Sequence, residues 1–140
     1  MLAQAWDFGP FGNPTWRHFP EAREAVKDLI CDELQRAIDA HREPEPVDDF
    51  EYVVHAVGPL FFDQLGKVNV DLDLVRRFCL FCRDVMSDSG PAAGSVSYTF
   101  NMYVLDGTDH PAAVRVLRQV DPELVEMVHT RYPGRWAERP

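Results

Sequence analysis

The amino-acid sequence predicts an all-α fold, with one domain of five to six helices in a bundle-like or helical-repeat-like arrangement. Apolar residues recur every three or four positions along most of the chain, which is the spacing of one helical face. Prolines and acidic residues stand where these stripes begin and end. A chain of 140 residues is long enough for one hydrophobic core. We therefore expect an arm at residues 1–20, a helical domain at 21–132 and a tail at 133–140.

The arm at residues 1–20 is rich in glycine and proline, which interrupt regular structure. Burying one large aromatic side chain contributes about 1.5–3 kcal/mol, which favours an ordered arm over a free one. We expect an irregular segment that docks in a groove of its own chain, with a neighbouring subunit as the alternative. The arm carries five such side chains, namely Trp6, Phe8, Phe11, Trp16 and Phe19.

The first predicted helix opens at Pro20 and carries a regular apolar stripe. The sequence HREPEPVDD ends it, because two prolines within three residues cannot continue a helix. A second helix is expected from Asp48, which resembles the start of a capping box with Glu51 three residues later. The Gly58-Pro59 pair should kink or split this second helix.

A third helix is expected to run from a cap at Asn69 or Asp71 to about Met86, and its many apolar positions predict deep burial. The segment 95–105 is ambiguous, because its apolar residues fit both the two-residue period of a strand and a helical stripe. The sequence KVNVDLDL also alternates. We expect helix in both places, since an isolated hairpin is marginal in water and no third strand is visible.

Two more helices are expected to complete the domain. Thr108 or Asp109 is the expected cap of the first, which ends at Val120. Asp121 and Pro122 are typical of the N-cap and the first position of the second.

The charge of the chain favours a basic protein partner. A formal net charge of −9 argues against nucleic-acid binding, which needs lysine and arginine to neutralise phosphates. No apolar run is long enough to cross a bilayer, so no membrane association is expected. Residues 32–51 hold eight acidic residues against two arginines, and this net charge of −6 is two thirds of the total. The candidate partner-binding residues are Asp39, Glu43, Glu45, Asp48, Asp49 and Glu51, although a solvated helix face and a flexible loop would look similar.

Cys79 and Cys82 have two residues between them, a spacing shared with redox and metal-binding pairs. They fall inside the expected third helix, whereas a redox pair uses a helix N-terminus to lower a thiol pKa. Helical residues three apart hold their Cβ atoms about 5–6 Å apart, and a disulfide needs about 3.5–4.5 Å. We expect two reduced core cysteines, no metal and no cofactor. Three cysteines and no secretory leader pattern favour the cytoplasm.

No catalytic set can be assembled from the sequence, so no catalytic residue is assigned. Glu126 and His129 match half of a di-iron motif, which needs a second copy. His55 has no paired serine or cysteine nucleophile. The alternative is a small-molecule-binding protein or an enzyme, with a pocket between helices that uses His55, Tyr98 and Tyr103 as its polar groups.

A resemblance rests on four stretches: DFEYVVHAVGPLFFDQL, LVRRFCLFCRDVMSDSG, SYTFNMYVLDG and DPELVEMV. In helix order and apolar pattern they resemble a largely uncharacterised group of short acidic all-helical bacterial proteins, some of which look like immunity partners of toxins. The resemblance spans about residues 48–130 and transfers no functional residue. It implies a non-enzymatic inhibitor of a protein partner. A third hypothesis is a structural subunit that hides the aromatic arm in a homodimer.

Overall fold

The computed structural model describes residues 7–67, 69–88 and 93–137. Within these ranges the chain forms seven continuous helices and no strand, so the all-α prediction is confirmed and the expected five to six helices is slightly low. Trp6 lies outside the described residues, as do residues 89–92. No helix in the described ranges combines the length and the apolar character needed to span a bilayer.

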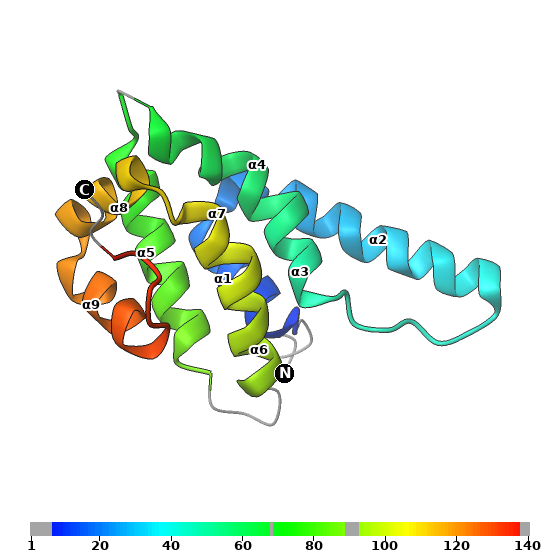
Figure 1. The fold of residues 1–140 in the computed structure, drawn as a ribbon. Helices are drawn as coiled ribbons and strands as arrows, with labels where there is room; N and C mark the ends of the chain where they lie inside the picture. Colours follow the sequence, from blue (N-terminus) through cyan, green and yellow to red (C-terminus); the bar gives the residue numbers. More distant parts are fainter. Residues whose placement is uncertain (1–6, 68, 89–92, 138–140) are drawn as a thin grey trace.

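Figure 1 colours the helices by their position in the sequence and shows α2 extending beyond the others. Short segments labelled η extend or join several helices; η3 and η5 are π-helical, and η2 and η4 are 3-10 helices. The bounds are α1 Gly9–His18, η2 Pro20–Ala22, α2 Arg23–Ala40, α3 Asp49–Tyr52, η3 Val53–Val57, α4 Gly58–Phe61, η4 Phe62–Gly66, α5 Leu72–Met86, α6 Ala93–Thr99, η5 Phe100–Leu105, α7 Asp106–Thr108, α8 Pro111–Val120 and α9 Pro122–Arg131.

The N-terminal arm contains α1, so the prediction of an irregular segment is wrong. Pro10 lies in the first turn of α1, where a backbone N–H group would have no intrahelical acceptor, so the absence of this group in proline costs nothing. α1 packs against α2, α3 and α5, and it places Phe11 in the core. This packing outweighs the poor helix propensity of a segment that contains two glycines and two prolines. The expected docking of the arm on its own chain is confirmed for Phe11 and Phe19, which are both buried.

A chain of aromatic rings joins α1 to α5 and α4. Phe61 stacks on Phe78 with ring centroids 3.9 Å apart, and Phe78 lies 6.0 Å from Phe81. Phe81 in turn contacts Phe11 at 6.3 Å and Phe19 at 5.7 Å. The prediction that the third helix is deeply buried is therefore confirmed for α5.

The Gly58-Pro59 pair does not break its helix. The preceding segment η3 widens to a π-helix, in which the amide of Gly58 bonds to the carbonyl of Val53 five residues earlier. A wider turn leaves room for a proline ring that would otherwise clash with the carbonyl four residues before it. The ambiguous segment 95–105 is helical as expected, and its second half is the π-helix η5.

Two of the predicted helix caps are confirmed. The carboxylate of Asp71 accepts from the amide of Leu74 at 3.2 Å, and that of Asp121 accepts from Leu124 at 3.1 Å. Asn69 and Val70, which precede the Asp71 cap, lie in neither a helix nor a strand. The helix expected over KVNVDLDL therefore forms only from Leu72 onward.

Two other caps differ from the prediction. Asp48 occupies the N-cap of α3 but makes no side-chain capping bond. The cap of α8 is His110, whose Nδ1 accepts from the amide of Ala113 at 3.4 Å, and not Thr108 or Asp109. Thr108 is still inside α7, where its hydroxyl donates to the carbonyl of Val104 at 2.9 Å.

The segment expected as a C-terminal tail contributes a large core residue. Trp136 is 0 % exposed. Its Nε1 donates to Thr108 Oγ1 at 2.9 Å, and its backbone amide donates to Asp109 Oδ1 at 3.1 Å. The preceding Arg135 donates to Asn101 at 2.9 Å. Residues 135–136 therefore close the core over η5 and α7.

Candidate functional site

The distal half of α2 and the linker at residues 41–48 form a protrusion of the fold (Figure 1). His41 ends α2 in the left-handed conformation, with φ of 54°, and the linker returns toward α3. The apolar stripe of α2 continues beyond the core, because Leu34 is 44 % exposed and Ile38 is 67 % exposed. This protrusion carries the acidic segment together with uncovered apolar side chains.

Glu33 attaches the linker to α2. Its carboxylate accepts from Arg42 Nη1 at 2.7 Å and Nη2 at 3.2 Å, and from the amide of Glu45 at 2.8 Å. The hydrogen bonds from Arg42 are the main reason that the pKa of Glu33 falls to about 2. One of the two arginines of the acidic segment is thus engaged inside the protrusion.

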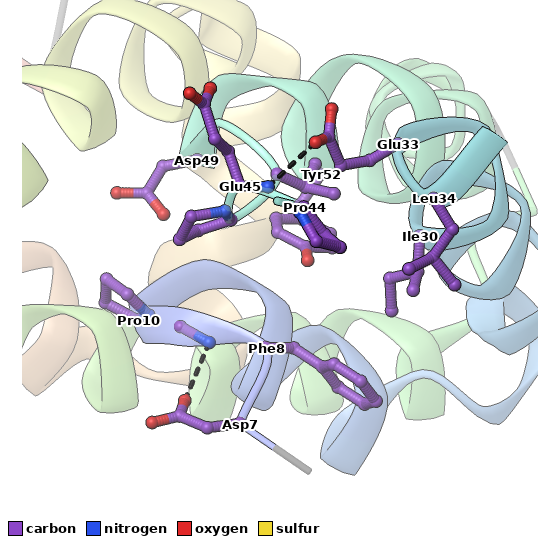
Figure 2. Close-up of a pocket in the computed structure, with 13 residues that line it drawn as sticks. Asp7, Phe8, Pro10, Ile30, Glu33, Leu34, Pro44, Glu45, Asp49 and Tyr52 are labelled. Atoms are coloured by element: carbon purple, nitrogen blue, oxygen red, sulfur yellow. Dashed lines mark hydrogen bonds between the residues drawn. The ribbon is translucent and has the colours of Figure 1, made fainter. Parts of the chain in front are cut away.

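A groove of about 500 Å³ lies where the linker crosses between α1, α2 and α3. Figure 2 shows its two sides, with Pro10 on α1 facing the linker and α3. The lining combines carboxylates with apolar side chains, and none of the described residues that line it is lysine or arginine. Its apolar residues include Phe8, Pro10, Ile30, Leu34, Pro46 and Val47.

Tyr52 projects from α3 into this groove (Figure 2). Its side chain is almost completely covered, since Tyr52 is only 2 % exposed. Close approach of α1 contributes to this burial, because a Cβ atom at Gly12 would lie 2.8 Å from Tyr52 Cζ. Burial, followed by the negative charges of Asp49, Glu51 and Asp7, raises the pKa of Tyr52 to about 12. The phenol therefore stays protonated.

The hydroxyl of Tyr52 makes no hydrogen bond to any described residue. Every side-chain nitrogen or oxygen atom that is fully buried in the described residues has a hydrogen-bond partner, so the Tyr52 hydroxyl is not fully buried. The hydroxyl oxygen is therefore the part of Tyr52 that reaches the groove. Asp49 also lines the groove and is half-buried, and its pKa is raised by burial first and then by the charges of Asp48 and Asp88. Asp7, at the start of α1, accepts from Gly9 at 2.9 Å.

The six candidate partner-binding residues are spread over the protrusion and the start of α3. Glu45 and Asp49 line the groove, whereas Asp39 accepts from Gln35 at 2.9 Å on the exposed side of α2. Glu43 and Asp48 are exposed, and Glu51 is half-buried at the start of α3. Among the described residues, Glu43, Glu45, Asp48 and Asp49 form no ion pair within 4.0 Å.

Sequence reasoning missed three residues of the groove. Glu33 belongs to the acidic segment, so its charge could be read from the sequence. Its hydrogen bonds to Arg42 and Glu45, however, form only because the chain turns at His41. Tyr52 falls within the expected second helix, and nothing in the sequence signals that its hydroxyl lacks a partner. Asp7 lies in the arm, 26 residues before Glu33, and only the packing of α1 brings it to the groove.

The residues expected around an alternative pocket lie elsewhere. His55, Tyr98 and Tyr103 are exposed, and none of them lines the groove. Tyr103 stacks on Phe50 with ring centroids 5.5 Å apart. This contact forms part of an exposed face on α3–η3 and α6–η5, which we call the aromatic face; it comprises Phe50, Val54, Tyr98, Met102 and Tyr103.

Cys79 and Cys82 are buried in α5 with free thiols, as expected for core residues. Burial raises the pKa of Cys79 to about 12 and raises that of Cys82 well above its usual range. In residues 7–67, 69–88 and 93–137, no cluster of three or more histidine, cysteine or acidic side chains could hold a metal ion.

No family model, curated protein or solved structure matches this chain. The resemblance to immunity-like proteins therefore stays a prediction, and the function is argued from the protrusion and its groove.

Proposed function

We propose that this protein is a non-enzymatic binding module of the immunity or antitoxin kind, which inhibits a basic protein partner in a reducing cytoplasm. The observation that carries this proposal is a set of four carboxylates on the linker and at the start of α3 that form no ion pair within 4.0 Å among the described residues, namely Glu43, Glu45, Asp48 and Asp49. Carboxylates that are not held in an ion pair remain available to attract a positively charged surface. Such a field also accelerates association with a basic partner.

The exposed apolar residues of α2 complete the requirements for an interface. Stable interfaces combine a desolvated apolar centre with a polar rim. Leu34 and Ile38 can supply the apolar centre, and the surrounding carboxylates supply the rim. The clamp between Glu33 and the linker holds these groups in one arrangement before binding, which lowers the entropy lost on association.

Affinity purification of the tagged full chain from its native host, in increasing salt, tests the proposal. The retained protein should be basic and should dissociate as salt screens the charges. The triple variant Glu43→Lys, Glu45→Lys and Asp48→Lys should weaken binding at least about tenfold, because reversed charges repel the same surface.

A matched control makes the same charge change outside residues 32–51. The triple variant Glu24→Lys, Asp28→Lys and Glu123→Lys alters three exposed acids on α2 and α9 and should retain the partner. An acidic partner, or equal loss in both triple variants, would contradict the proposal.

Self-association is a second candidate, favoured by the aromatic face. Monomeric proteins rarely expose apolar patches beyond a few hundred Å², and a two-fold interface would place Tyr103 and Phe50 of two copies against each other. Sedimentation of the full chain tests this candidate. A concentration-dependent dimer that Tyr103→Asp abolishes would support it, and a monomer at all concentrations would contradict it.

A further inference from the structure

We propose that the groove beneath the linker receives a lysine or arginine side chain from an extended basic segment of the partner. This inference rests on the proposed function and names what the partner must present. Within the described part of the chain it is carried by three features that meet at one place: apolar walls, carboxylates that form no ion pair and the hydroxyl of Tyr52, which makes no hydrogen bond.

The walls suit the aliphatic stem of a long cationic side chain. Pro10 in α1 and Phe8 just before it line the groove on one side, and Ile30 and Leu34 line it from α2 (Figure 2). Lysine and arginine bury their methylene groups against such surfaces while the charged head reaches polar groups. The groove volume of about 500 Å³ leaves room for the side chain and part of the backbone that carries it.

The polar groups of the groove suit the charged head. Asp7, Glu45 and Asp49 line it, with no lysine or arginine among the lining residues that the structure describes, and Asp49 is partly desolvated. Tyr52 offers a protonated hydroxyl whose oxygen can accept an N–H bond. An ammonium or guanidinium group has several donors and can satisfy a phenol and a carboxylate together.

Other occupants leave these groups unsatisfied. An anion would be repelled by the lining carboxylates. A wholly apolar segment would cover the hydroxyl of Tyr52 and the carboxylate of Asp49 without giving either a partner, which costs free energy. A cation on an apolar stem satisfies both requirements.

Synthetic peptides titrated into the full chain test this assignment. The probe is a capped heptapeptide, Ala-Leu-Arg-Ala-Leu-Arg-Ala, and its control replaces each arginine with citrulline, which keeps the shape and removes the charge. We expect amide chemical-shift changes at Gly9, Glu45 and Val47, and binding about tenfold weaker for the citrulline peptide.

Two tyrosine variants separate the groove from general charge attraction. Tyr52→Phe removes the hydroxyl from the groove and should weaken the arginine peptide about threefold to tenfold. Tyr98→Phe removes a hydroxyl from the aromatic face and should leave the affinity unchanged. Thermal melting of each variant checks that its fold is intact, and Asp49→Asn provides a second variant within the groove.

Four results would overturn the inference: no saturable shift at millimolar peptide, equal affinity for the citrulline peptide, unchanged affinity in both Tyr52→Phe and Asp49→Asn, or equally strong displacement by spermidine. Spermidine displacement would point to a free polyamine instead of a protein segment. If the native partner depends on Glu43, Glu45 and Asp48 but binds Tyr52→Phe normally, this inference fails and the proposed function stands.

Discussion

Glu33 and Arg42 join α2 to the chain that follows it through two hydrogen bonds, of 2.7 and 3.2 Å, to the same carboxylate group. The same carboxylate also accepts from the amide of Glu45 at 2.8 Å. Three bonds to one side chain thus determine where the linker lies, and the linker forms one side of the groove.

The first prediction concerns this clamp. Glu33→Gln should increase hydrogen exchange at the amide of Glu45, while the melting temperature changes little because the site lies at the surface. Glu24→Gln, on the same helix in an exposed pair with Lys27, is the control and should leave this exchange unchanged. Unchanged exchange in Glu33→Gln would show that the clamp does not hold the linker.

Acid should release the same clamp. The pKa of Glu33 is lowered from 4.5 to about 2, so its carboxylate stabilises the folded linker above pH 4.5, and this contribution is lost as the pH falls toward 2. Exchange at Glu45, corrected for the intrinsic pH dependence, should therefore rise over this range in the native protein. Glu33→Gln should show no such rise.

The third prediction concerns α1. Phe11→Ala should lower the free energy of unfolding by about 3–5 kcal/mol, because it removes a buried ring and leaves a cavity beside Phe81. Leu80→Ala, at an exposed position of α5, should cost less than half as much. Denaturant unfolding monitored by circular dichroism gives both values. Equal and small losses would mean that α1 adds little to the core.

The fourth prediction concerns Trp136. Replacement by alanine should cost about 3–5 kcal/mol, since a buried indole is lost. Replacement by phenylalanine should cost less, because most of the ring is kept and the lost interaction is mainly the hydrogen bond to Thr108. Unfolding free energies of the two variants test the order. If Trp136→Ala melts like the native protein, residues 135–136 do not close the core.

The fifth prediction concerns the thiols. Cys31 is exposed, whereas Cys79 and Cys82 are buried with raised pKa values, so native protein should react with iodoacetamide at one thiol and unfolded protein at three. Cys82→Ser should lower stability by about 1–3 kcal/mol because it buries a more polar group, and Cys31→Ser should not. Elemental analysis should find no stoichiometric zinc or iron; one metal per chain would contradict a purely structural role.

Much of the fold could be predicted because the signals were local. The stripes of α2 and α5 follow from residues three and four apart, and the caps at Asp71 and Asp121 require contacts only three residues away. α1 could not be predicted in the same way, since its glycines and prolines oppose a helix and the packing of Phe11 against α5 overrides them.

The candidate site was predictable only in its charge. The acidic residues of 32–51 predicted an acidic surface, and Glu43 and Asp48, which form no ion pair among the described residues, lie there. The groove itself joins residues 7–10, 30–34 and 44–52, and no local pattern links these segments.

Helical periodicity, charge and capping are properties of neighbouring residues, so the all-α class and the acidic segment can be recognised in the chain as written. The partner of a buried ring or hydroxyl depends on which helices meet. Trp136 becomes a core residue because Thr108 and Asp109 face it, and Tyr52 becomes a groove residue because α1 covers its ring at Gly12. These contacts follow from the packing of segments distant in sequence, where burial outweighs local preference.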